Sequence, residues 1–241
     1  DLAFPHHENE IAQSEAANGC EFVHYWLHNG FINIDNKKMS KSLGNFFTVR
    51  EAAAAYGYDC IRMFMLMSHY RSPLNYSGEI LMQAKNALER LNTAKKNLEF
   101  FMANGKDGEL TETETAFVAA LPKFREKFCA AMDDDFNTAD AIAAIFELVR
   151  DVNAAVSPAS DPTKALAKMC YDEFTELCGV LGIPFAAETA DLDKEIEEKI
   201  AARQAARKAK NFAEADRIRD ELKAEGIVLE DTPQGVKWHR A

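Results

Sequence analysis

The chain has 241 residues, of which 47% are hydrophobic and 28% charged, with a formal net charge of -11. This length suffices for two or three compact domains, and the sequence contains no apolar run of the roughly 20 residues that a membrane helix needs. The acidic balance excludes a general nucleic-acid coat protein, which would be basic, but a local basic patch can still bind RNA. The first five residues lack the features of a signal peptide, and the missing initiator methionine is consistent with a truncated start.

The cysteines stand at positions 20, 60, 129, 170 and 178, an odd number without a C-x-x-C pair. This spacing argues against a disulfide framework and against a zinc knuckle built from cysteines alone. It suits the reducing cytoplasm, where we expect the protein to reside. The simplest interpretation is that the cysteines are small buried side chains.

Residues 1–75 have a mixed pattern. The alternating stretch 30–36 predicts a strand that enters a polar loop, with Asp35-Asn36 as the turn signal. Residues 48–68 are predicted to be helical, because Thr48 and Glu51 have the spacing of a capping box.

Residues 77–182 show helical spacing of apolar residues almost throughout. Four helices are predicted, and short loops between them describe an antiparallel bundle, which could serve only as a scaffold. Their approximate ranges are 77–103, 113–133, 138–152 and 163–181.

The C-terminal end changes pattern again after a predicted linker at 186–191. Two helices are expected at about 192–210 and 212–225, with Gly226 as the helix stop and a hairpin after it. The predicted fold is therefore mainly α, with part of an α/β domain, a four-helix bundle and a small α+β domain. The corresponding ranges are 1–76, 77–185 and 192–241.

The sharpest motif is Lys38-Met39-Ser40-Lys41-Ser42, here named the lysine loop. Two lysines three positions apart on a loop can reach one triphosphate, and the two serines add hydroxyl donors. Such cations can stabilise the charge that develops on a leaving pyrophosphate, and Gly44 would let the loop close. A solvated lysine turn is the alternative interpretation.

The lysine loop and its flanks resemble one family. The loop is the signature of class I aminoacyl-tRNA synthetases, and the strings at 4–15, 62–76 and 133–139 are similar to bacterial cysteinyl-tRNA synthetases, in their C-terminal portion. The resemblance covers essentially the whole chain. It implies a remnant of a class I catalytic domain, a DALR-type tRNA-binding bundle and an anticodon-binding domain. It also implies catalytic roles for Lys38 and Lys41, with Lys41, Ser40 and Ser42 contacting ATP.

The implied reaction activates cysteine with ATP, supplied with magnesium, to cysteinyl-adenylate. The cysteinyl group then passes to the 3′ end of cysteine tRNA. The family also carries a His-x-Gly-His type signature, whereas His24 and His28 lie here without the glycine. We therefore expect an incomplete ATP site and a chain that is inactive alone. Tyr25, Trp26 and His28 are expected either to pack near the active site or to form aromatic core.

His6 and Glu10 are four residues apart, so on a helix they share one face. Imidazole and carboxylate are both zinc ligands, although such a pair is commonly a surface ion pair. The resemblance implies a zinc site completed by two upstream cysteines, and Cys20 and Cys60 do not match their positions. Zinc prefers a thiolate, so it would separate cysteine from serine. We expect this chain alone to bind zinc weakly or not at all.

The C-terminal residues offer an RNA-binding pattern. Arg203, Arg207, Lys208 and Lys210 form a basic cluster that can hold phosphates. The aromatic faces in this region suit unstacked bases, and the carboxylates can accept hydrogen bonds from base amino groups. The alternative is a charged surface helix with one core tryptophan. The resemblance assigns the reading of the GCA anticodon to Arg207, Phe212, Asp216, Asp231 and Trp238.

Three functions are compatible with these patterns. The first is a fragment of a cysteine–tRNA ligase, expected to be monomeric. The second is a non-catalytic tRNA-binding module. The third is a paralogous ligase that joins cysteine to an amino sugar, against which the basic and aromatic residues at 192–241 argue.

Overall fold

The computed structural model describes residues 2–40, 44–183, 185, 190–232 and 235–240. Contacts divide the chain into two compact units, 1–88 with 126–144 and 89–125 with 145–241. Three of the long helices run through both units, so this division does not follow the sequence-based domain ranges, which remain a prediction. Over the described ranges, no helix has both the length and the apolar character needed to cross a bilayer.

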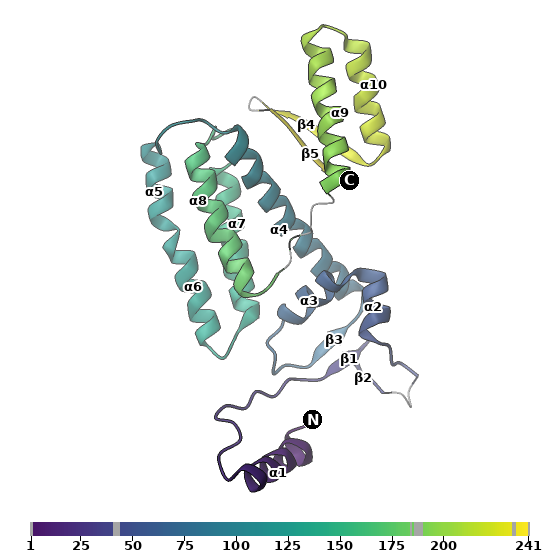
Figure 1. The fold of residues 1–241 in the computed structure, drawn as a ribbon, viewed down its shortest axis with the longest axis vertical. Coiled ribbons are helices and arrows are strands. Elements are labelled where there is room, and N and C mark those ends of the chain that lie inside the picture. The colour runs from purple at the N-terminus through teal and green to yellow at the C-terminus, as the bar shows by residue number, and fades with distance from the viewer. Residues whose placement is uncertain (1, 41–43, 184, 186–189, 233–234, 241) are drawn as a thin grey trace. The chain divides into compact units, whose positions relative to one another are not determined.

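The N-terminal segment of the first unit is helical. A short π-helix, η1 (Ala3–His7), continues into α1 (Glu8–Asn18), as Figure 1 shows in purple. Gly19 ends α1 with φ of 66°, a left-handed conformation that favours glycine. None of the residues of α1 is buried within the described structure.

A three-stranded sheet follows, with the order β2-β1-β3. Its strands are β1 (Ile32–Ile34), β2 (Lys37–Lys38) and β3 (Leu74–Tyr76). β1 pairs antiparallel with β2 and parallel with β3. Asp35 and Asn36 have φ of 48° and 61° and close the β1–β2 hairpin, which confirms the predicted strand and turn.

The helical stretch predicted over 48–68 forms two helices rather than one, α2 (Val49–Tyr56) and α3 (Tyr58–Leu66). The capping box at its start is confirmed, since Thr48 Oγ1 accepts from Glu51 N and Glu51 Oε2 accepts from Thr48 N at 2.7 Å. The prediction of a continuous helix was wrong because Gly57 has φ of 84°, which no helix interior adopts.

The bundle contains five helical segments where four were predicted. α4 (Gly78–Asn104) comes first, and the segment predicted as one helix over 113–133 is α5 (Glu112–Ala120) and α6 (Pro122–Asp133). Pro122 cannot donate the backbone hydrogen bond that would continue α5, so it starts a new helix instead. α7 (Thr138–Ala155) and α8 (Lys164–Val180) match the remaining predictions.

The bundle core in the second unit consists of aliphatic and aromatic side chains at helical spacing. Burying each of them stabilises the fold by roughly 1.5–3 kcal/mol. Those that are nearly inaccessible are Leu91, Leu98 and Phe101 of α4, Phe124 of α6, Ile145 and Leu148 of α7, and Phe174 and Leu177 of α8.

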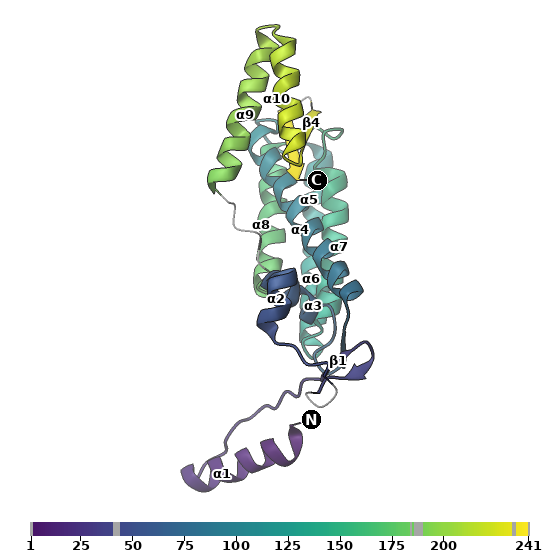
Figure 2. The same ribbon diagram turned by 90° about the vertical axis from the view of Figure 1, so that its right-hand side faces the viewer.

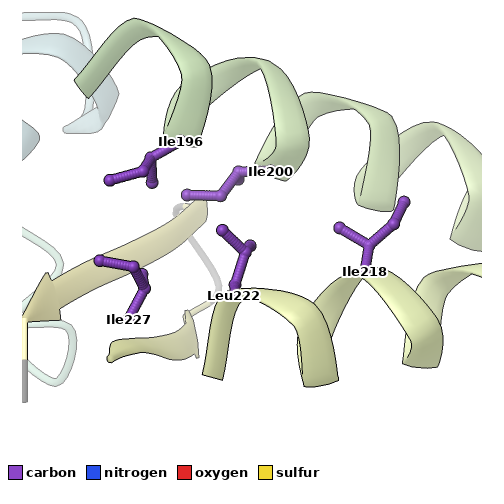
Figure 3. Close-up of a cluster of buried hydrophobic side chains, with 5 residues drawn as sticks. All are labelled: Ile196, Ile200, Ile218, Leu222 and Ile227. Carbon is purple, nitrogen blue, oxygen red and sulfur yellow. The ribbon is translucent and has the colours of Figure 1, made fainter. Parts of the chain in front are cut away.

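The C-terminal domain consists of α9 (Ala190–Lys208), α10 (Phe212–Ala224), β4 (Ile227–Thr232) and β5 (Gly235–Arg240). The two helices lie side by side in Figures 1 and 2, and the two strands pair antiparallel. Gly226 has φ of 77° between α10 and β4, which confirms the predicted stop. The small core between helices and hairpin contains Ile196, Ile200, Ile218, Leu222 and Ile227 (Figure 3).

Candidate functional site

The lysine loop begins at the end of the β1–β2 hairpin. Lys38 is exposed on β2, while Lys41 and Ser42 lie outside the described residues. Asn45 joins the two sides of the loop, because its Oδ1 accepts from Ser40 N at 2.9 Å and its Nδ2 donates to Lys38 O at 3.2 Å. Lys38 therefore stands on a backbone segment that the Asn45 side chain holds through two hydrogen bonds.

The sheet also supports the hairpin that leads into the loop. Asn75 of β3 accepts from Asn36 N at 2.8 Å, which fixes the turn between β1 and β2. The Tyr76 ring packs on Phe47 with centroids 4.2 Å apart. The sequence analysis missed Asn45 and Asn75, although asparagines beside a turn are the residues most able to cap backbone groups.

The predicted zinc ligands are exposed, His6 on η1 and Glu10 on α1. Their chemistry suits zinc, but two donors fill half of a tetrahedral site. Within the described ranges, no group of three or more histidine, cysteine, aspartate or glutamate residues is placed to hold a metal ion. The imidazole of His6 and the carboxylate of Glu10 are thus suitable zinc ligands, but the described residues supply too few of them for a complete site.

An aromatic stack forms beside this pair. The His7 ring packs against His28 and Trp26, with centroid distances of 4.9 and 5.2 Å. His7 Nδ1 is buried and has no hydrogen-bond partner among the described residues. The sequence analysis named Trp26 and His28 but missed His7, which joins them. The alternative that Tyr25 is aromatic core is wrong, because this residue is 87% exposed.

Two arginines of α9 hold Asp231 in the C-terminal domain. Arg203, which is 5% exposed, donates to both carboxylate oxygens at 2.9 Å, and Arg207 Nη1 donates to Oδ2 at 2.9 Å. The hydrogen bonds and charge of Arg203, followed by the charge of Arg207, lower the pKa of Asp231. The carboxylate predicted to face a base is therefore already paired, and it orients the exposed Arg207.

The other predicted RNA-contacting residues occupy different surroundings. Phe212 begins α10 and is 63% exposed. Asp216 pairs with Arg219 at 3.2 Å. Trp238 packs against the domain core, and the Lys96 ammonium lies 4.6 Å from its ring centroid. The structure thus joins Arg207 to Asp231 directly and gives Phe212 the most accessible ring.

Comparison with known proteins adds a consistent pattern along the chain. Residues 1–86 match the family described as tRNA synthetases class I (C) catalytic domain. Residues 127–186 match the DALR domain, and residues 189–238 match the cysteinyl-tRNA ligase anticodon binding domain. The three matches follow one another without overlap.

Individual relatives agree with these matches. A cysteine–tRNA ligase of Lachnospira eligens is 54% identical over 241 residues, all of this chain and 51% of the relative. One from Clostridioides difficile is 55% identical over 240 residues, again all of this chain and 51% of the relative. A LeuRS of Agrobacterium radiobacter K84, solved in a ternary complex with tRNA, is similar in fold alone. Its TM-score is 0.55 at 20% identity, covering 75% of this chain and 26% of that one.

The fold and the lysine loop, together with these matches, define part of a class I aminoacyl-tRNA synthetase. Within that class the chain belongs to the cysteinyl-tRNA synthetase family, whose C-terminal portion it matches. The chain spans about half the length of the curated relatives it matches.

Proposed function

We propose that this chain supplies the lysine loop and the tRNA-binding portion of a cysteine–tRNA ligase. The complete reaction would activate cysteine with ATP, accompanied by magnesium, to cysteinyl-adenylate. The cysteinyl group would then pass to the 3′ end of cysteine tRNA. The observation that carries the proposal is the match of all 241 residues to cysteine–tRNA ligases at 54% identity. The proposal places the protein in the cytoplasm as a monomer.

The lysine loop would stabilise the charge of the leaving pyrophosphate. Lys38 is exposed at the end of β2, and the Asn45 side chain bonds the backbone on both sides of Met39. A cation held in place before the reaction lowers the barrier more than one that must be ordered during it. Lys41 and the hydroxyls of Ser40 and Ser42 complete this role.

His6 and Glu10 would contribute two ligands to a zinc site whose other donors lie outside the described residues. When bound, zinc would supply a coordination position that favours the thiolate of cysteine. Both side chains are exposed and lie one helical turn apart, so they can face a common partner.

The C-terminal domain would bind the anticodon arm. The Asp231 carboxylate orients the Arg207 guanidinium, which is exposed enough to contact phosphate. Phe212 offers a ring for an unstacked base, and Trp238 and Asp216 would act at the edge of the same surface. Stacking of one base on an aromatic ring is worth roughly 1–3 kcal/mol.

A titration of the chain with labelled cysteine tRNA at several salt concentrations tests this role. Arg207→Ala should weaken binding and reduce the slope of log affinity against log salt by about one. Phe212→Ala should weaken binding without changing that slope. The control is Arg217→Ala. Arg217 is exposed like Arg207, but it lies on α10 and pairs with Glu214 and Glu221. Equal affinity of all three variants, or no tRNA binding at low salt, would contradict the proposal.

A non-catalytic tRNA-binding module is the second candidate. It is favoured by the number of donors at His6 and Glu10, which is too small for a complete zinc site. The same titration gives tRNA binding under both candidates. They are separated by an assay of cysteine-dependent ATP–pyrophosphate exchange in a hybrid, in which this chain replaces the matching half of a related cysteine–tRNA ligase. The amino sugar ligase is disfavoured because residues 189–238 match an anticodon-binding domain.

A further inference from the structure

We propose that Asp135 is a positioning residue that fixes, through Tyr70, the β1–β2 hairpin that leads into the lysine loop. This inference rests on the proposed function, in which the loop after this hairpin stabilises the leaving pyrophosphate. Asp135 lies in the turn between α6 and α7, 65 positions from Tyr70 in the sequence. Both residues belong to the first compact unit.

Three consecutive residues lie against the carboxylate of Asp135, one as a hydrogen-bond donor and two as basic neighbours. Tyr70 Oη donates to Oδ1 at 2.8 Å, Arg71 Nε lies 2.9 Å from Oδ2, and His69 Nε2 lies 3.7 Å from Oδ2. Arg71 Nε also donates to Tyr70 Oη at 3.1 Å. The hydroxyl of Tyr70 is therefore held between an anion and a cation, which restricts its rotation.

The turn that carries Asp135 has an unusual backbone. Asp135 and Phe136 have φ of 55° and 54°, in the left-handed region that residues with a side chain seldom adopt in succession. Thr138 Oγ1 donates to Leu66 O at 2.8 Å, at the end of α3. Such a conformation persists only where surrounding contacts determine it. Besides hydrogen bonds within the turn, two of these contacts reach Leu66 at the end of α3 and Tyr70 in the segment after it.

Tyr70 passes the constraint to the strand that leads into the lysine loop. Its carbonyl accepts from Gly30 N at 2.7 Å, and Phe31 O accepts from Leu74 N at 2.9 Å. A Cβ atom at Gly30 would lie 2.4 Å from Ser72 O, so only glycine allows this approach. β1 starts two residues later and lies beside β3 in Figure 1, and the hairpin from β1 ends at Lys38.

Side chain and backbone of Tyr70 are thus bonded to two different elements. Asp135 holds the hydroxyl, and the strand entering the lysine loop donates to the carbonyl. Removing the first contact frees the 69–73 segment, and the hairpin opens more often. The fold of α6 and α7 does not depend on this bond, because their own cores remain.

Limited trypsin digestion of the chain under native conditions measures this opening directly. Cleavage after Lys37 and Lys38 is followed by mass spectrometry, relative to cleavage after Lys208 in the other unit. Asp135→Ala and Tyr70→Phe should each raise the relative rate roughly tenfold, and the double variant should rise no further than either one. Asp135→Asn keeps an acceptor for Tyr70 and tolerates the left-handed backbone, so it should restore most of the protection.

Asp134→Ala is the matched control, because this exposed neighbour lies in the same turn. It should leave the relative rate unchanged. If Asp135→Ala fails to fold, Tyr70→Phe decides, since it removes one hydroxyl and no packing. The proposal would be overturned if Tyr70→Phe left cleavage after Lys37 and Lys38 unchanged. It would also be overturned if cleavage after Lys208 rose by the same factor. The assay uses neither ATP nor tRNA, so its failure is distinct from a failure of the proposed function.

Discussion

Arg203 of α9 forms a bidentate ion pair with Asp231 of β4, with both N–O distances at 2.9 Å. The pair joins a helix to the hairpin 28 positions later. Arg207 shares the same carboxylate from the exposed side. Asp231 therefore pairs with two arginines, of which Arg203 is buried and Arg207 is accessible.

Arg203→Ala should destabilise the C-terminal domain by about 2 kcal/mol, because charged hydrogen bonds are lost and Asp231 keeps only Arg207. Urea unfolding followed by Trp238 fluorescence measures the change. Arg207→Ala is the control, since its half-exposed pair should contribute less than about 1 kcal/mol. If both substitutions cost the same, the distinction between the two arginines is wrong.

The contribution of Asp231 to stability should depend on pH. Its pKa is lowered in the folded state, chiefly by hydrogen bonds from Arg203. A lowered folded pKa means that the contribution is complete above the unfolded value of about 3.9 and is lost as pH falls through the folded value. The stability difference between the wild type and Asp231→Asn should be constant from about pH 5.5 to 7 and shrink below about pH 4. A difference that grows on acidification would contradict this.

The thiols should separate into two classes. Cys20 and Cys129 are exposed, whereas Cys60, Cys170 and Cys178 are buried. Burial raises the pKa of Cys170 and Cys178 to about 12, so they hold almost no thiolate at neutral pH. A colorimetric thiol reagent should modify two thiols per native chain rapidly and the rest only after unfolding. Rapid reaction of more than two would show that the buried set is accessible.

Glu114 caps two segments at once. Its Oε2 accepts from Thr111 N and its Oε1 from Thr163 N, both at 2.8 Å. Burial alone would raise the pKa of Glu114, but the hydrogen bonds from Thr163 and Thr111 lower it. Glu114→Gln retains one acceptor, so one buried N–H loses its partner at a cost of about 1–2 kcal/mol. Urea unfolding measures this cost, and the exposed Glu112→Gln should change stability by less than about 0.5 kcal/mol.

Local signals in the sequence predicted most of the fold. The capping box of Thr48 and the turn at Asp35-Asn36 act within a few residues, so their chemistry is visible without tertiary structure. The breaks at Gly57 and Pro122 were missed because apolar spacing continues across both. At such points the backbone preference of one residue outweighs the periodicity of its neighbours.

The candidate sites were less visible. The lysine loop was recognised by its resemblance to a family signature, whereas the contacts of Asn45 with Lys38 and Ser40 depend on the folded backbone. The pairing of Tyr70 with Asp135 depends on the packing of helices that are distant in sequence. Asp231 was correctly placed in the C-terminal hairpin, but its partner Arg203 required the tertiary fold. Long-range pairs of this kind have no periodic signature.

The central claim is that this chain is a functional half of a cysteine–tRNA ligase. In the most direct test, this chain replaces the matching 51% of the Lachnospira eligens ligase, and transfer of cysteine to cysteine tRNA is measured. The control, called the rejoined parent, is the Lachnospira eligens ligase cut and joined again at the same position. The hybrid should charge the tRNA with cysteine and not with serine. Changing both Lys38 and Lys41 to alanine should reduce the rate of cysteine charging roughly a hundredfold or more. A folded hybrid that charges no tRNA while the rejoined parent does, or one indifferent to the two lysines, would contradict it.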